Sequence, residues 1–434
     1  MKRIAKLLLV LPMTIIIGCT AKNKEKTSMD SKTPVTEIKK TEAGYQFYLN
    51  GEPFYIKGAG LGNGSIEELA NHGANALRTW SADNGKAILD EAHKHGLKVM
   101  MGLWVGLERH GFDYNNEEAV QQQFERIKAS VLELKDHPAL LLWGIGNELN
   151  HQSNNPKIWD AVNDISKMIH EVDPNHLTTT PLAGMDKKYV DLIAERAPDL
   201  DFISVQLYAG IEVLPRIIEE SGYDGPILVT EWGATGYWEV AKTPWDAPLE
   251  NNSSVKADAY MRRYKNAIES QEQLIGSFVF LWGQKQERTP TWFGMFMPDG
   301  NATEPVDVMH YIWKGEWPKN RSPRLNDFSL DGKKASDNIR LKPEQTYTAN
   351  VDVTDPDADN LEYIWEIRKE STSNQTGGDR EYVPEALNDL ILKNNNSLVT
   401  IKTPRNEGAY RLFISVKDGH KHTAHANIPF YVEN

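Results

Sequence analysis

The feature that most constrains the fold is an alternation of apolar, strand-like stretches with amphipathic, helix-like stretches, repeated eight times between residues 54 and 314. The strand-like stretches are almost entirely apolar, which is typical of parallel strands covered on both faces. Eight such pairs favour a closed (β/α)8 TIM barrel over an open doubly wound sheet. We expect strands at 54–60, 76–80, 97–106, 140–147, 177–181, 202–208, 227–231 and 275–282, and helices at 66–72, 85–95, 119–136, 159–172, 189–196, 213–221, 255–270 and 308–314.

The pattern changes on either side of these pairs. Asn50-Gly51, between two short strand-like runs, predicts a hairpin ahead of the barrel. A Lys/Arg/Pro/Ser-rich linker at 318–324 follows the last helix, and after it come short runs that alternate polar and apolar residues between turn residues. That pattern is typical of a β-sandwich. We therefore predict a catalytic barrel at 41–318 and an immunoglobulin-like β-sandwich at 325–434.

The N-terminal segment has the layout of an export signal. A basic start precedes an apolar run at 7–17 that is too short to span a bilayer comfortably. Ile16-Ile17-Gly18-Cys19 resembles a bacterial lipobox, which implies cleavage before Cys19 and acylation of that residue; the alternative is an ordinary signal peptide with a chance cysteine. We expect a signal peptide at 1–18, a flexible tether at 19–40, and a lipoprotein anchored to a bacterial membrane, at the cell surface or in the periplasm.

Composition limits the partners. The formal net charge of −13 disfavours nucleic acid, so a neutral ligand is expected. The single cysteine of the chain excludes an intramolecular disulfide. We expect a monomer without a cofactor or a metal. His420, His422 and His425 could offer metal ligands, and the acidic loop at 355–359 could bind calcium, but a turn and a solvated loop are favoured.

Two apolar runs end in a glutamate. Glu148 closes the run that ends the fourth expected strand, and Glu231 closes the seventh. In a TIM barrel the residues at strand ends lie at the catalytic face. Hydrolysis of a glycosidic bond needs two carboxyls, one to protonate the leaving oxygen and one to attack the anomeric carbon or activate water. Either glutamate alone could be a structural ion-pair partner, but the pair favours catalysis.

Gly146-Asn147-Glu148 and Thr230-Glu231-Trp232-Gly233 resemble the retaining glycosidases of the large (β/α)8 clan that includes families 2, 5 and 17. The resemblance covers residues 41–316 and implies that Glu148 is the general acid/base and Glu231 the nucleophile. It further implies that Arg78 holds the nucleophile ionised, that Tyr208 hydrogen-bonds it, and that Trp282 forms the floor of the sugar subsite. Asn147 is expected to bond the sugar 2-hydroxyl. Retention predicts a carboxyl separation of about 5–5.5 Å.

Within the clan, the domain order and the spacing of the glutamates are most similar to glycoside hydrolase family 158, which implies an endo-acting β-1,3-glucanase that cleaves laminarin. The N-terminal sandwich domains typical of family 2 are lacking, which argues against a β-galactosidase or β-glucuronidase. The alternatives are a β-mannanase or β-1,4-glucanase of the same clan, and a non-catalytic glycan-binding lipoprotein.

Further contacts to the sugar are expected from loops after the strands. Trp238, Trp245 and Trp292 are candidate stacking platforms, whereas Trp143 lies along an apolar run and is expected in the core. His110, in the loop after the third strand, and His151, just past Glu148, are candidates for bonding sugar hydroxyls or for ordinary loop packing.

Overall fold

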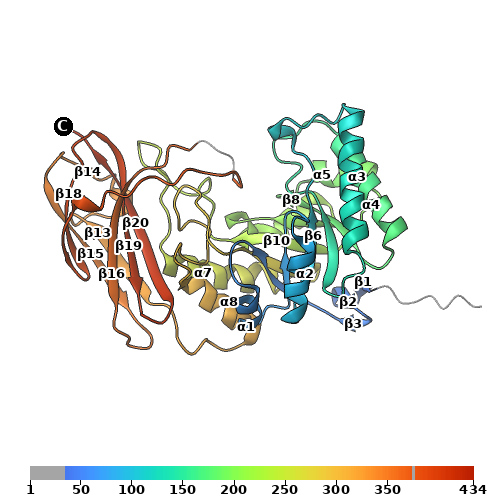
Figure 1. Ribbon diagram of the computed structural model, residues 1–434, viewed down its shortest axis with the longest axis horizontal. Helices are drawn as coiled ribbons and strands as arrows, with labels where there is room; N and C mark the ends of the chain where they lie inside the picture. The colour runs from blue at the N-terminus through green and yellow to red at the C-terminus, as the bar shows by residue number, and fades with distance from the viewer. Residues whose placement is uncertain (1–34, 374–376) are drawn as a thin grey trace, which may run out of the picture. The chain divides into compact units, whose positions relative to one another are not determined.

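The computed structural model describes residues 35–373 and 377–434 (Figure 1). The predicted signal peptide, the acylated Cys19 and most of the predicted tether lie outside the described residues. None of the helices in the described ranges has the length and apolar character needed to cross a membrane.

The predicted barrel is confirmed. Eight parallel strands close on themselves in the order β10-β11-β4-β5-β6-β7-β8-β9, and the pairing of β11 with β4 completes the ring. The strands are β4 (Ile56–Leu61), β5 (Ala76–Arg78), β6 (Lys98–Leu103), β7 (Leu140–Ile145), β8 (Thr178–Ala183), β9 (Phe202–Gln206), β10 (Ile227–Gly233) and β11 (Leu274–Trp282). Nearly every residue of these strands is buried, as the uninterrupted apolar runs predict.

A helix covers the barrel after each strand, and local sequence sets its ends. Asn116 caps α3 by accepting a hydrogen bond from the Ala119 amide at 3.1 Å, and Asn252 caps α7 in the same way. Helix α4 turns Ile158, Val162, Ile165 and Ile169 inward at helical spacing. The helices are α1 (Ile66–Asn71), α2 (Gly85–Lys94), α3 (Glu117–Leu134), α4 (Lys157–Val172), α5 (Lys187–Arg196), α6 (Leu214–Ser221), α7 (Ser253–Arg263) and α8 (Glu304–Lys314).

A small antiparallel sheet precedes the barrel. It consists of β1 (Thr36–Thr41), β2 (Gly44–Leu49) and β3 (Glu52–Pro53), with the predicted turn at Asn50-Gly51 between the last two. Residues 36–40, which we expected at the end of a flexible tether, are therefore a strand. The hydroxyl and amide of Thr36 both bond the Asn175 carbonyl, and the buried Phe47 of β2 packs on one end of the barrel.

The C-terminal region is a pair of β-sheets with its own core. One sheet contains β12 (Ala302–Thr303), β20 (His422–Val432), β19 (Gly408–Lys417) and β16 (Glu362–Lys369), with β14 (Arg340–Leu341) beside β20. The other contains β13 (Arg324–Leu330), β15 (Thr346–Thr354), β18 (Leu398–Lys402) and β17 (Ile391–Asn395). Alternate residues of β18 and β19 face a shared apolar core, as the period-two pattern predicts. Strand β12 comes from the segment between β11 and α8, so the barrel adds an edge to this sandwich.

Candidate active site

The carboxyl ends of the barrel strands open onto a cavity of about 680 Å³. Its walls come from the ends of β5 to β11 and the loops that follow them. They include both glutamates singled out from the sequence, together with exposed aromatic rings. A cleft of this size at this face is the expected location of a ligand site in a TIM barrel.

Glu231 lies at the end of β10 and is held by three donors. Its Oε1 accepts hydrogen bonds from Arg78 Nη1 at 3.1 Å and Trp80 Nε1 at 2.7 Å, and its Oε2 accepts one from the Tyr208 hydroxyl at 2.9 Å. The Glu231 side chain is 6% exposed, so the ion pair with Arg78 lies out of bulk water. One cation and two neutral donors stabilise the negative carboxylate and fix both of its oxygens.

Glu148 follows β7 and lies in a different environment. Its backbone is in the left-handed region, with φ of 51°, and its amide donates to the Pro181 carbonyl at 2.9 Å while its carbonyl accepts from the His151 amide. Such a conformation costs about 1–3 kcal/mol in a residue with a Cβ and is typical of functional sites. Burial, with the nearby charge of Glu231, raises the pKa of Glu148 to about 8, so this carboxyl holds its proton at neutral pH.

A chain of hydrogen bonds through Arg78 links the Glu231 carboxylate to Asn147, the residue before Glu148. The guanidinium of Arg78, 1% exposed, also donates to the Thr230 carbonyl and to Asn147 Oδ1 at 2.9 Å. Gln206 Nε2 donates to that same Asn147 oxygen at 2.7 Å. Because both donors take the oxygen, the NH2 group of Asn147 is the part of the amide left to donate to a ligand.

The arrangement combines a carboxylate stabilised as an anion with a carboxyl that keeps its proton. The raised pKa suits Glu148 to proton donation, and the three donors around its carboxylate suit Glu231 to nucleophilic or electrostatic work. The predicted neighbours of Glu231, namely Arg78 and Tyr208, both contact it. His110, His151, Trp104 and Trp238 line the cavity, and Trp238 is 53% exposed with its ring edge-on to Tyr208.

Three expected ligand contacts, at Trp282, Trp292 and Trp245, are wrong. Trp282 is fully buried, donates its indole N–H to the Ser65 carbonyl at 2.9 Å, and packs on Phe296. The pairing of β11 with β4 shifts register between Val279 and Trp282, so strict alternation along β11 fails there, and Phe280 lines the cavity in its place.

Trp292 is likewise buried, at 1% exposure, because its indole N–H bonds the Thr235 carbonyl and its ring lies beneath the loop that carries Tyr237. Trp245, the third aromatic candidate, lies outside this cavity and packs against Tyr431 of the sandwich. Trp143 belongs to the core, as predicted, with its indole bonded to Asp173.

Sequence reasoning missed several cavity residues. Trp80 lies two residues after Arg78, and Gln206 lies two residues before Tyr208. Residues two apart in a strand share a face, so this alternation could have identified both. Arg109 has two buried guanidinium nitrogens that lack a partner among the described residues, and it faces the cavity. Glu287, in the loop after β11, pairs with Lys285 at 2.7 Å. Gly377 to Asp379 also line the cavity, although they belong to the sandwich, and no local pattern signals this.

The candidate metal ligands are placed as follows. The carboxylates of Asp355, Asp357 and Asp359 lie within 4.8 Å of one another in an exposed to half-buried turn. In that turn Asp355 accepts hydrogen bonds from the amides of the other two residues. His422 pairs with Asp307 at 3.3 Å, and His425, in strand β20 of the sandwich, is buried.

Comparison with known proteins places the barrel in a family. Residues 64–285 match the family model "Glycosyl hydrolases family 2, TIM barrel domain". The chain is 24% identical over 285 residues to a β-galactosidase of Staphylococcus xylosus, covering 59% of this chain and 25% of that protein. It is 22% identical over 275 residues to a β-glucuronidase of Paenibacillus borealis, covering 55% and 44%. A mannan endo-1,4-β-mannosidase of Aspergillus clavatus is 29% identical over 167 residues, covering 32% and 37%.

Solved structures give the same fold. β-Glucuronidase 2 of Bacteroides uniformis superposes with a TM-score of 0.50 at 14% identity, over 92% of this chain and 48% of that one. The Dictyoglomus thermophilum β-D-glucuronidase gives 0.50 at 18%, over 65% and 54%. The chain thus spans between a quarter and just over half of the length of these proteins. The predicted clan is confirmed. Family 158, which we favoured on domain order, is not supported by these matches.

Proposed function

Since this chain belongs to glycosyl hydrolase family 2 through its TIM barrel domain, we propose that it hydrolyses β-glycosidic bonds with retention of configuration, using Glu231 as nucleophile and Glu148 as general acid/base. The observation that carries the proposal is the contrast between the two carboxyls. Glu231 accepts three hydrogen bonds as an anion, whereas burial raises the pKa of Glu148 so that it stays protonated.

In the first step Glu231 attacks the anomeric carbon while Glu148 gives its proton to the leaving oxygen. The bond that forms joins a Glu231 oxygen to the sugar, and the bond that breaks releases an alcohol. The negative charge of Glu231 is lost in this step, so one cause of the raised pKa of Glu148 is removed. Glu148, now deprotonated, can take a proton from the incoming water, which displaces Glu231 and restores both groups.

For the substrate we propose a neutral β-glycan, with internally cleaved β-1,3-glucan such as laminarin as the first candidate. The exposed Trp104 and Trp238 rings in the cavity support a glycan, because sugar C–H faces stack on such rings. β-Mannan and β-1,4-glucan remain alternatives within the clan. Two nitrogens of Arg109 lack a partner among the described residues, which favours one further candidate, a β-glucuronide, whose carboxylate the guanidinium could bind in two-point fashion. This candidate is the one that we disfavoured on domain layout.

The cellular setting is also proposed. The lipobox-like residues before Cys19 support a monomeric lipoprotein anchored at the cell surface or in the periplasm. Mass spectrometry of the membrane fraction, with Cys19→Ser as the comparison, tests the acylation.

Azide trapping on an activated aryl β-glycoside tests the two roles. Glu148→Ala should lose general-base help, and azide should restore turnover with a β-glycosyl azide as product, because azide attacks the glycosyl-enzyme. Glu231→Ala should instead give an α-glycosyl azide by direct displacement. Glu195→Ala, at an exposed glutamate of α5, is the control and should react as the wild type does. The same azide anomer from both cavity variants would reject the role assignment.

Substrate and catalytic competence are tested together by product analysis on laminarin, mannan, cello-oligosaccharides and an aryl β-glucuronide. Hydrolysis of one class identifies the substrate. Binding of a glycan without hydrolysis of any of them would favour the non-catalytic alternative.

A further inference from the structure

Part of the cavity wall comes from the C-terminal sandwich. Residues 377–381, which we call the arm, lie in the connection between β16 and the 3-10 turn η5 (Asn388–Leu390). Both flanking elements belong to the C-terminal region of the chain. The arm nevertheless lines the barrel cavity through Gly377, Gly378 and Asp379.

One side of the arm rests on the loops after β10 and β11. Glu381, 8% exposed, accepts a hydrogen bond from the Arg288 amide at 2.7 Å, and the Arg288 guanidinium lies over the Tyr237 ring at 4.5 Å. Gly377 lies close to Glu287 and Trp238: a Cβ added to this glycine would be 3.2 Å from Glu287 Oε1 and 3.8 Å from the Trp238 ring. The glycine lets the arm approach these cavity residues.

The other side of the arm reaches across the barrel. Asp379 Oδ1 lies 3.1 Å from Nε2 of His110, which ends the 3-10 turn η1 (Glu108–His110) after β6. In the closed ring, β6 and β10 are separated by three strands in either direction, so they lie on opposite sides. Gly377 and Asp379 are two residues apart and therefore no more than about 7 Å from each other along the chain. The arm thus joins opposite rims of the cavity.

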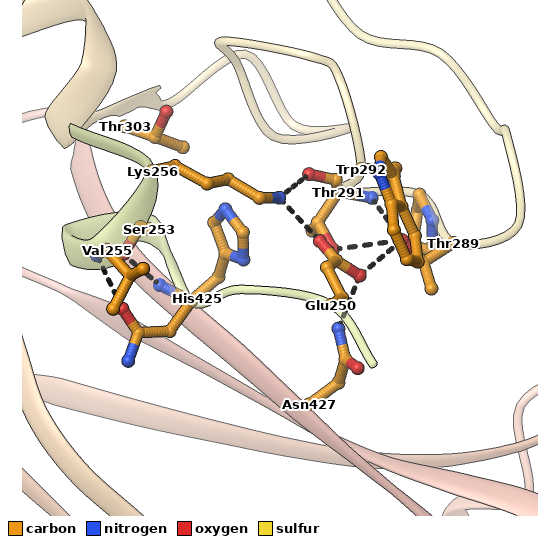
Figure 2. Close-up of polar contacts among 12 residues, drawn as sticks. Glu250, Ser253, Val255, Lys256, Thr289, Thr291, Trp292, Thr303, His425 and Asn427 are labelled. Atoms are coloured by element: carbon orange, nitrogen blue, oxygen red, sulfur yellow. Dashed lines mark hydrogen bonds and ion pairs between the residues drawn. The ribbon is translucent and has the colours of Figure 1, made fainter. Parts of the chain in front are cut away.

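A buried polar cluster fixes the sandwich from which the arm emerges (Figure 2). Glu250, in the loop after β10, accepts hydrogen bonds from Lys256 Nζ at 2.6 Å, from Thr289 and Thr291 of the loop after β11, and from Asn427 of β20 at 2.6 Å. The Glu250 and Lys256 side chains are 0% and 5% exposed. One carboxylate therefore ties two cavity loops to the sandwich, and a buried charge with all these partners strongly resists displacement.

We propose that the arm is the end wall of the substrate cleft and that Asp379 is a specificity-determining residue, which limits how many sugar units bind on one side of the cleaved bond. The inference rests on the proposed hydrolase function and names the part of the site that sets chain length. The pair of Asp379 with His110 closes the cleft at that end, and the carboxylate oxygen not engaged with His110 can accept a hydrogen bond from a terminal sugar hydroxyl.

Chain-length dependence tests the proposal. We compare product lengths from the polymer that the wild type cleaves, and the ratio of kcat/KM on polymer to kcat/KM on a trisaccharide. Asp379→Ala and His110→Ala should each lengthen the products and raise the ratio at least threefold. Because His110 acts through its contact with Asp379, the double variant should shift the ratio no further than Asp379→Ala alone.

His170→Ala is a matched control, since His170 pairs with Asp201 at 3.0 Å with similar exposure but outside the cavity. If Asp379→Ala and His110→Ala both left the product lengths and the kcat/KM ratio unchanged, the proposal would be overturned, and the hydrolase assignment would still stand. Loss of the proposed function would show instead as a wild type that hydrolyses no glycan.

If the wild type hydrolyses no glycan, crosslinking still tests whether Asp379 lies beside His110. Cysteines introduced as His110→Cys and Asp379→Cys, in a Cys19→Ser background, should be joined by a short bismaleimide in the folded protein. Failure to crosslink, with either cysteine alone still labelled by a monofunctional maleimide, would refute the end wall.

Discussion

Tyr208→Phe isolates one of the three donors that hold Glu231. The substitution removes only the hydroxyl, which lies 2.9 Å from Glu231 Oε2. Burial and the charges of Glu231 and Glu148 raise the pKa of the Tyr208 hydroxyl well above its usual range, so it remains a donor at every working pH. The hydroxyl also fixes the position of Glu231 Oε2 for attack, and a misplacement of a reacting group by about 1 Å can cost about 100-fold in rate. We therefore expect kcat/KM to fall by about 10- to 100-fold.

The assay is steady-state hydrolysis of an aryl β-glycoside, with unfolding in urea followed in parallel. Tyr223→Phe is the control, because its hydroxyl bonds the Pro226 carbonyl and the Ile203 amide and lies outside the cavity. Tyr208→Phe should lose about 1.5–3 kcal/mol of unfolding free energy, and Tyr223→Phe about 1 kcal/mol. Only Tyr208→Phe should lose activity. A Tyr208→Phe enzyme within twofold of wild-type kcat/KM would refute the claim that this donor stabilises the reacting carboxylate.

The remaining predictions concern pH and the aromatic residues. Because Glu148 holds its proton up to about pH 8, kcat/KM should fall as the pH rises through that value. On a glycoside whose leaving group needs no protonation, Glu148→Gln should abolish this fall in kcat/KM at high pH. Burial lowers the pKa of His425 to about 3, so below about pH 6.5 the unfolded chain binds a proton at this residue and the native state does not. The free energy of unfolding should therefore drop by about 2 kcal/mol between pH 8 and pH 5. In urea titrations, His425→Gln should reduce this dependence on pH. Trp104→Ala and Trp238→Ala should raise KM for glycan. Trp292→Phe should instead lower the melting temperature and leave KM unchanged. A change of KM in Trp292→Phe would show that Trp292 contacts the substrate after all.

The sequence predicted the barrel because eight repeats of an apolar run and an amphipathic helix leave a parallel sheet few ways to close. It also located Glu148 and Glu231, since strand ends are local features and all eight ends converge on one face, and the family resemblance added Arg78 and Tyr208. The family resemblance misplaced Trp282, because a register shift in the pairing of β11 leaves that ring buried and puts Phe280 at the cavity. Such a shift depends on how neighbouring strands pair, which one strand's own sequence does not encode.

The sequence by itself thus determined the fold class and the pair of carboxyls, because periodicity and strand ends are properties of short segments. Only the tertiary structure decided the different environments of the two carboxyls, since burial and hydrogen-bond donors come from residues on other strands. It also decided the contribution of the sandwich. Asp379 lies 269 positions after His110 in the chain, and the two meet because contacts such as that of Glu250 with Asn427 hold the sandwich against the barrel.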